Sequence, residues 1–108
     1  MITVEYRPKY NVLSVEGHAY SGEPGHDLVC SAASMLAHTL AANVQALKAQ
    51  GAVRDVVVEL ESGKAYIRCT PTSRMKSISP LIYNSICLGF ELLARDYPHN
   101  ISYKILGG

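Results

Sequence analysis

His18 and Cys30 are the two residues of the sequence best suited to chemistry. His18 follows a segment in which apolar and polar residues alternate as in a β-strand, and Cys30 stands near the start of a segment whose apolar residues have helical spacing. The loop between them contains Gly22, Pro24 and Gly25. A thiol attacks as its thiolate, which a helix N-terminus or a nearby imidazolium favours. The pair is therefore typical of a cysteine peptidase, in which the imidazole takes the thiol proton and later delivers it to the leaving amine.

Two residues near the thiol have a simple structural interpretation and a functional one. Asp27 is a plausible N-cap or first-turn acid for the helix, and its carboxylate could also orient a histidine. Ser34 follows Cys30 by one turn on the same helix face, as a small packing residue or as a hydrogen-bonding partner of the site. Because we predict Cys30 in the first turn, backbone N–H groups near Cys30 and Ser31 could stabilise an oxyanion.

Two other interpretations of this stretch stay open. Cysteine is among the most often buried residues, so Cys30 could be unreactive in a non-catalytic module that binds a ribosome or another protein. Alternatively, a metal could be held by four residues of ligand type, although their spacing matches no structural zinc pattern: His18, His26, Asp27 and Cys30. Thiol reactivity and metal content distinguish the three hypotheses. The peptidase hypothesis requires no cofactor and no metal.

Length and charge restrict the class of protein. The 108 residues correspond to one domain, residues 1–108, and a hydrophobic fraction of 48% is enough to form a core without disulfides. The net charge of +1 argues against a general electrostatic grip on nucleic acid. No signal peptide and no membrane span are expected, since a basic segment followed by an apolar one is missing and no long apolar run occurs.

The three cysteines indicate a reducing compartment. Cys30, Cys69 and Cys87 are an odd number without a C-x-x-C pair, which excludes a zinc ribbon or a thioredoxin-like motif. At least one thiol stays free in a monomer, so we expect a cytoplasmic protein. We interpret Cys69 and Cys87 as core residues, and His38 and His99 as surface or helix-end residues.

The first half of the sequence predicts two strands and a long helix. Residues 2–7 and 12–16 alternate between apolar and polar side chains, and Pro8 separates them, which favours a hairpin. A helical pattern runs from Leu28 or Val29 to about Gln50, and Gly51 is a suitable stop. Its buried side is predicted at Val29, Ala33, Leu36, Leu40, Val44 and Leu47.

The second half predicts another hairpin, a helix and a last strand. Residues 56–61 and 64–69 alternate around a tight turn at Ser62 and Gly63. A helix is expected over roughly 75–97, with Ser79 as its cap and Pro80 in the first turn. A strand follows at 101–105. The predicted buried stripe of this helix is Ile78, Ile82, Ser85, Gly89, Leu92 and Leu93.

The order β-β-α-β-β-α-β predicts an α+β fold. We expect a mostly antiparallel sheet of four to five strands with two helices packed against it.

The stretch that carries the chemistry also resembles a known family. Gly17-His18-Ala19, followed by Gly22-x-x-Gly25-x-Asp27-x-Val29-Cys30-Ser31-Ala32-x-Ser34, is similar to the signature of the ribosomal-processing cysteine protease Prp family. The Met-Ile-Thr-Val start and the overall length are similar as well. Ser31 stands where alanine is common in the family, a mild departure beside the nucleophile.

This resemblance implies a small bacterial cytoplasmic cysteine endopeptidase, usually a homodimer. Family members remove an N-terminal extension from the large-subunit ribosomal protein L-twenty-seven, and they cut after an aromatic residue. The resemblance assigns His18 and Cys30 as the catalytic pair and Asp27 and Ser34 as motif residues. It also implies a mobile loop that orders around substrate, to which Gly17, Gly22 and Gly25 lend flexibility. No direct nucleic-acid or membrane partner is expected.

Overall fold

The structure is a computed structural model that describes residues 1–18 and 26–107, with the backbone alone described at positions 26 and 27. Within these ranges the chain forms β1 (Ile2–Arg7), β2 (Val12–Glu16), α1 (His26–Ala49), β3 (Val53–Glu61), β4 (Lys64–Pro71), a short 3₁₀ turn η1 (Ser73–Met75), α2 (Ser79–Asp96) and β5 (Ile101–Ile105). Apart from η1, this is the predicted order of elements.

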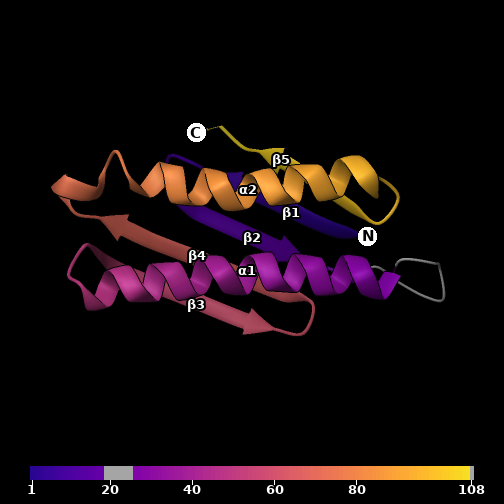
Figure 1. The fold of residues 1–108 in the computed structure, drawn as a ribbon, viewed down its shortest axis with the longest axis horizontal. Coiled ribbons are helices and arrows are strands. Elements are labelled where there is room, and N and C mark those ends of the chain that lie inside the picture. The colour runs from indigo at the N-terminus through magenta and orange to yellow at the C-terminus, as the bar shows by residue number, and fades with distance from the viewer. Residues whose placement is uncertain (19–25, 108) are drawn as a thin grey trace.

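The five strands form one mixed sheet in the order β3-β4-β2-β1-β5. β1 and β2, β2 and β4, and β3 and β4 pair antiparallel, whereas β1 and β5 pair parallel. The two helices lie side by side over the same face of the sheet (Figure 1). The predicted α+β fold is therefore confirmed. The sequence did not specify the strand order, including the pairing of β2 with β4 and the parallel pairing of β1 with β5.

The first hairpin and α1 form as the residue pattern predicts. Ile2, Val4 and Tyr6 are buried under the helices, while the residues between them are turned to the open face. The side of α1 that faces the sheet contains three alanines among its larger apolar residues, and these small side chains let the helix lie close to the sheet. The residues of this side are Val29, Ala33, Ala37, Leu40, Ala41 and Val44. α1 ends where predicted, because Gly51 adopts a φ of +73° and donates to the carbonyl of Lys48.

α1 begins earlier than predicted, at His26 rather than at Leu28 or Val29. Cys30 is therefore the fifth residue of the helix and lies in its second turn. At that position its N–H belongs to the helical hydrogen-bond ladder, and the free donors of the helix start lie one turn earlier. The expected oxyanion donors at Cys30 and Ser31 are thus not supported. The apolar periodicity missed the start because the first turn of the helix begins with two polar residues, His26 and Asp27.

α2 differs from its prediction in both its start and its buried stripe. The helix begins at Ser79, and the cap position is Ile78 rather than Ser79, whose hydroxyl instead donates to Oδ1 of Asn11 at 3.3 Å. The residues buried against the sheet are Ser79, Tyr83, Cys87 and Phe90. The predicted stripe combined the side of α2 that faces α1, where Gly89 packs on Leu36, with exposed positions such as Ile78, Ser85 and Leu92.

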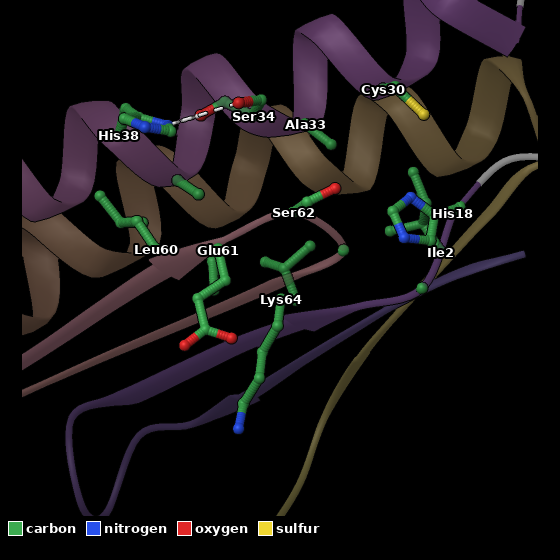
Figure 2. Close-up of a pocket in the computed structure, with 15 residues that line it drawn as sticks. Ile2, His18, Cys30, Ala33, Ser34, His38, Leu60, Glu61, Ser62 and Lys64 are labelled. Carbon is green, nitrogen blue, oxygen red and sulfur yellow. Dashed lines mark hydrogen bonds between the residues drawn. The ribbon is translucent and has the colours of Figure 1, made fainter.

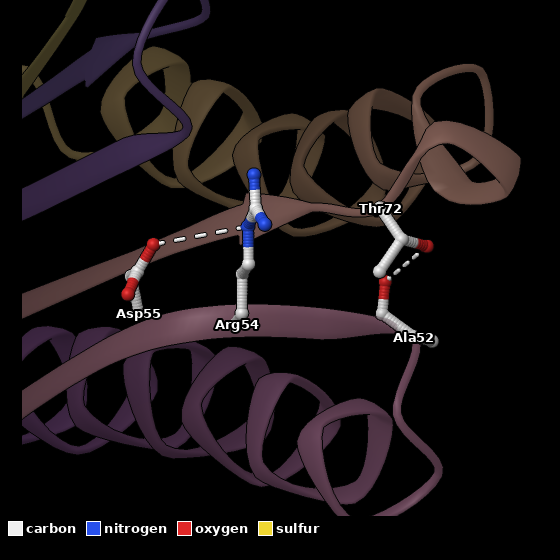
Figure 3. Close-up of polar contacts among 4 residues, drawn as sticks. All are labelled: Ala52, Arg54, Asp55 and Thr72. Atoms are coloured by element: carbon white, nitrogen blue, oxygen red, sulfur yellow. Dashed lines mark hydrogen bonds and ion pairs between the residues drawn. The ribbon is translucent and has the colours of Figure 1, made fainter.

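β3 is longer than predicted. The prediction missed its first residues because an irregular segment interrupts the alternation of apolar and polar side chains. The strand begins at Val53, and its register with β4 shifts between Arg54 and Val57. Asp55 adopts a φ of +52° in this bulge, and its carboxylate lies 3.9 Å from Arg54 (Figure 3). At the same end, the hydroxyl and the N–H of Thr72 both donate to the carbonyl of Ala52. A bulge breaks the period of two, which hides this part of the strand in the sequence.

Candidate active site

A cleft of about 250 Å³ opens between α1 and the turn that joins β3 to β4. His18 and Cys30 both line it, His18 from the segment after β2 and Cys30 from α1 (Figure 2). The floor and sides are largely apolar, and the remaining lining residues are Ile2, Val15, Gly17, Ala33, Ser34, Ala37, His38, Leu60, Glu61, Ser62, Gly63, Lys64 and Ala65. The fold thus brings the two predicted reactive groups to one cavity.

The backbone around His18 is held from two sides. The carbonyl of His18 accepts a hydrogen bond from the amino group of Met1 at 2.8 Å, and the N–H of Gly17 donates to the carbonyl of Gly63 at 2.9 Å. Gly17 has a φ of +104°, and a Cβ at this position would collide with the carbonyl oxygen of Met1. Glycine is therefore required here by close approach of two backbones, a reason separate from the flexibility expected from the sequence.

Cys30 is a free thiol at the edge of the hydrophobic core. Its side chain is partly exposed, and it packs against the core beneath α1. Figure 2 shows its sulfur turned toward the end of the cleft at which the imidazole of His18 lies. The other two thiols, Cys69 and Cys87, are buried as predicted. Among the three cysteines, only Cys30 is accessible to a substrate.

Ser34 and His38 continue the row that Cys30 begins along α1. Nδ1 of His38 donates to the carbonyl of Ser34 at 2.8 Å and lies 3.4 Å from the Ser34 hydroxyl. Both side chains line the cleft, with His38 at the far end from His18 (Figure 2). His38 is exposed, as the sequence interpretation of a surface residue expected, but its place in the cleft was not predicted. Its spacing from Cys30 and Ser34, four residues at each step, was the available signal.

The opposite wall is the β3–β4 turn, which the sequence placed correctly but did not connect with the site. The hydroxyl of Ser62 points into the cleft, whereas the charged ends of Glu61 and Lys64 point away from α1 (Figure 2). Gly63 lies directly against the imidazole of His18. No sequence signal connected this turn with His18, because the two segments are brought together only by the pairing of β2 with β4.

Several predicted site residues lie outside what the structure describes. Gly22 and Gly25 belong to the undescribed segment, and the side chains of His26 and Asp27 are likewise outside the description. Within the described residues, no group of three or more potential ligands could hold a metal ion. No helix in that part of the chain is long and apolar enough to cross a membrane.

Comparison with known proteins agrees with this geometry. A sequence model of the family described as cysteine protease Prp matches residues 1–102. The ribosomal processing cysteine protease Prp of Staphylococcus aureus is 30% identical over 106 residues, which cover 95% of each chain.

Two solved structures are similar throughout. The ribosomal processing protease Prp of S. aureus, in complex with a covalently linked product peptide, matches with a TM-score of 0.73 and 25% identity over 98% of this chain and 100% of that one. A Streptococcus mutans protein matches with a TM-score of 0.67 and 27% identity over 99% and 93%. With a family match over nearly its whole length and a relative 30% identical across 95% of both chains, the chain belongs to the cysteine protease Prp family.

Proposed function

We propose that this cysteine protease cuts its substrate with a dyad of His18 and Cys30. The observation that carries the proposal is that both side chains line one cleft, although they come from different elements of the fold. Each is partly exposed, so a peptide can reach them from solvent. A thiol at the mouth of a cleft beside an imidazole is the arrangement that activates a nucleophilic cysteine.

The reaction follows from the chemistry of the two groups. His18 takes the thiol proton of Cys30, and the thiolate attacks the scissile carbonyl carbon. As the tetrahedral intermediate collapses, the carbon–nitrogen bond breaks and His18 returns the proton to the leaving amine. A thioester between Cys30 and the acyl half remains. Water then attacks it with His18 as the base, which releases the new carboxylate and restores the thiol.

We propose an N-terminal extension of a ribosomal protein, L-twenty-seven, as the substrate. The S. aureus relative is a ribosomal processing protease, and it has been crystallised with a covalently linked product peptide. The cleft also suits an apolar side chain next to the cut, because Ile2, Val15 and Leu60 line it while the charged ends of its wall are turned outward. This composition supports cleavage beside an aromatic residue.

Mass spectrometry of a peptide that spans the junction of the extension tests the proposal. The wild type should produce a single cut, and Cys30→Ser and His18→Ala should each produce none while keeping the circular dichroism of the wild type. Treatment with a chelator should leave the wild-type rate unchanged. A folded wild type that binds the peptide without cutting it would instead favour the non-catalytic module, and loss of activity with chelator would favour a metal site.

We further propose, from the family resemblance, that the enzyme works in the cytoplasm as a homodimer. Sedimentation equilibrium of the purified chain measures the number of subunits directly.

A further inference from the structure

We propose that Gly63 is a positioning residue for His18, and that the absence of a side chain at this point of the β3–β4 turn holds the imidazole in its catalytic place. The inference rests on the dyad proposed above. It concerns a residue that lies far from both members of the dyad in the sequence and that the family signature quoted above does not include.

The space that a side chain would fill at position 63 is occupied by the His18 ring. A Cβ built on Gly63 would collide with Nε2 of His18, and it would lie 2.7 Å from Cε1 and 3.1 Å from Cδ2. The three nearest atoms all belong to the imidazole. Carbon atoms of real side chains do not approach this closely, so the ring would have to leave its position.

The same residue also holds the backbone that leads into His18. The carbonyl of Gly63 accepts the N–H of Gly17 at 2.9 Å, which ties the end of β2 to the turn. The imidazole therefore occupies the space where a side chain of residue 63 would lie, while Gly17 is hydrogen-bonded to the carbonyl of the same residue. One residue of the turn thus constrains both the backbone next to His18, through its carbonyl, and the position of the imidazole, through the space that it leaves open.

Gly17 and Gly63 differ in what a side chain would displace. At Gly17 the nearest atoms are backbone atoms of Met1 and Ile2, which cannot move without breaking the sheet. At Gly63 they are the end of a side chain, which can rotate away at little cost to the fold. Replacement of Gly63 should accordingly leave a folded protein whose histidine is misplaced, whereas replacement of Gly17 should damage the fold.

Backbone strain is the effect that must be separated from this steric one. Gly63 has a φ of +77°, which alanine adopts only with strain. Gly51, at the end of α1, has nearly the same φ of +73°, and a Cβ there would meet nothing within 4 Å. Gly51→Ala therefore introduces the same strain without the collision and is the matched control for Gly63→Ala.

The test compares Gly63→Ala, Gly51→Ala and His18→Ala in peptide cleavage, thermal unfolding and alkylation of Cys30 by iodoacetamide as a function of pH. Both glycine variants should lower Tm similarly, by about 4–8 °C. Only Gly63→Ala should lose cleavage rate, by about 100-fold, because a displaced base no longer reaches its proton. Its alkylation profile should match that of His18→Ala, and Gly51→Ala should match the wild type.

A double variant shows whether the effect passes through the histidine. In a His18→Ala background, Gly63→Ala should leave the alkylation profile unchanged, because the ring it displaces is gone. If Gly63→Ala is too unstable to assay, Gly63→Asn tolerates the positive φ better and carries the same Cβ.

Two results overturn the inference and are distinguishable. If Gly63→Ala cleaves as fast as Gly51→Ala while His18→Ala is inactive, the dyad stands and the positioning role of Gly63 is wrong. If His18→Ala itself cleaves like the wild type, the dyad is wrong and the role of Gly63 is lost with it.

Discussion

The thiols of Cys30 and Cys87 lie in two contrasting regions of the molecule. Cys30 lines the cleft between α1 and the β3–β4 turn, partly exposed, with the imidazole of His18 at the same end. Cys87 lies on the sheet-facing side of α2 and is only 3% exposed. Burial raises the pKa of the Cys87 thiol, and a hydrogen bond with Tyr103 lowers it in part.

The two thiols differ in their access to solvent and in the kind of side chain in their surroundings, an imidazole that lines the same cleft for Cys30 and a phenol for Cys87. An imidazole exchanges protons near neutral pH, so it can accept one from a thiol and return it. A phenol in the same position does not, and burial raises the pKa of Tyr103 above the usual phenol value. Cys69 is in a similar position, since the hydroxyl of Tyr83 donates to its sulfur at 3.7 Å inside the core. The fold therefore keeps two thiols inert and leaves one available for chemistry.

The largest expected effect of this contrast is in alkylation of the native protein. At pH 7, iodoacetamide should modify Cys30 at least about 1,000-fold faster than Cys69 or Cys87, because the buried thiols react only when the core opens, at a cost of several kcal/mol. Mass spectrometry of proteolytic fragments measures the three rates separately. In urea the three rates should become similar. Rapid modification of Cys87 in the folded protein would contradict the contrast.

The second effect is that alanine substitution at Cys87 should change stability but not cleavage, whereas alanine substitution at Cys30 should change mainly cleavage. Cys87→Ala should lower the free energy of unfolding by about 1 kcal/mol, because it leaves a small cavity beneath α2, and should leave the cleavage rate within about twofold of the wild type. Cys30→Ala should abolish cleavage and destabilise the fold less. Urea denaturation and peptide cleavage measure the two quantities. Slow cleavage by a fully folded Cys87→Ala protein would mean that the buried thiol also serves the reaction.

Much of the fold could be predicted because its elements follow simple periodicities. The alternation in β1, β2 and β4 and the alanine-rich side of α1 correspond to a single buried face each, and Gly51 marks the end of α1 through its positive φ. The prediction of buried residues and strand bounds failed where an element packs on two neighbours or where a bulge interrupts its pattern. α2 faces both the sheet and α1, so its apolar residues form two stripes, and the bulge at Asp55 breaks the alternation of β3.

The site was predictable only in the parts that are close in the sequence. His18, Cys30 and Ser34 stand near one another along the chain, and their residue types indicate their chemistry. Gly63 carries no such signal, and the spacing of His38 from Ser34 places it on the same helix face without showing that this face lines a cleft. Gly63 reaches the imidazole only because β2 pairs with β4, and the cleft that His38 lines exists only because the β3–β4 turn lies opposite α1. Contacts set by tertiary structure are not visible in local spacing.

The smallest expected effect is a decline of stability in alkaline solution that depends on Cys87. The raised pKa of this thiol in the folded protein means that the unfolded chain loses its proton first, near pH 8.5. The stabilising contribution is therefore complete below that pH and is lost as the pH rises toward the folded pKa. The slope is at most about 1.4 kcal/mol per pH unit for one proton.

The tyrosines with raised pKa values, Tyr6, Tyr83 and Tyr103, begin to contribute only near pH 10, where phenols of the unfolded chain ionise. The interval between about pH 8.5 and 10 thus separates the thiols from the phenols, and the comparison with Cys87→Ala separates Cys87 from the other two cysteines. Urea denaturation across this interval should show a falling free energy of unfolding in the wild type and a flatter curve in Cys87→Ala. Equal slopes for the two proteins would mean that the Cys87 thiol ionises as readily in the folded core as in water, and the contrast with Cys30 would then rest on access alone.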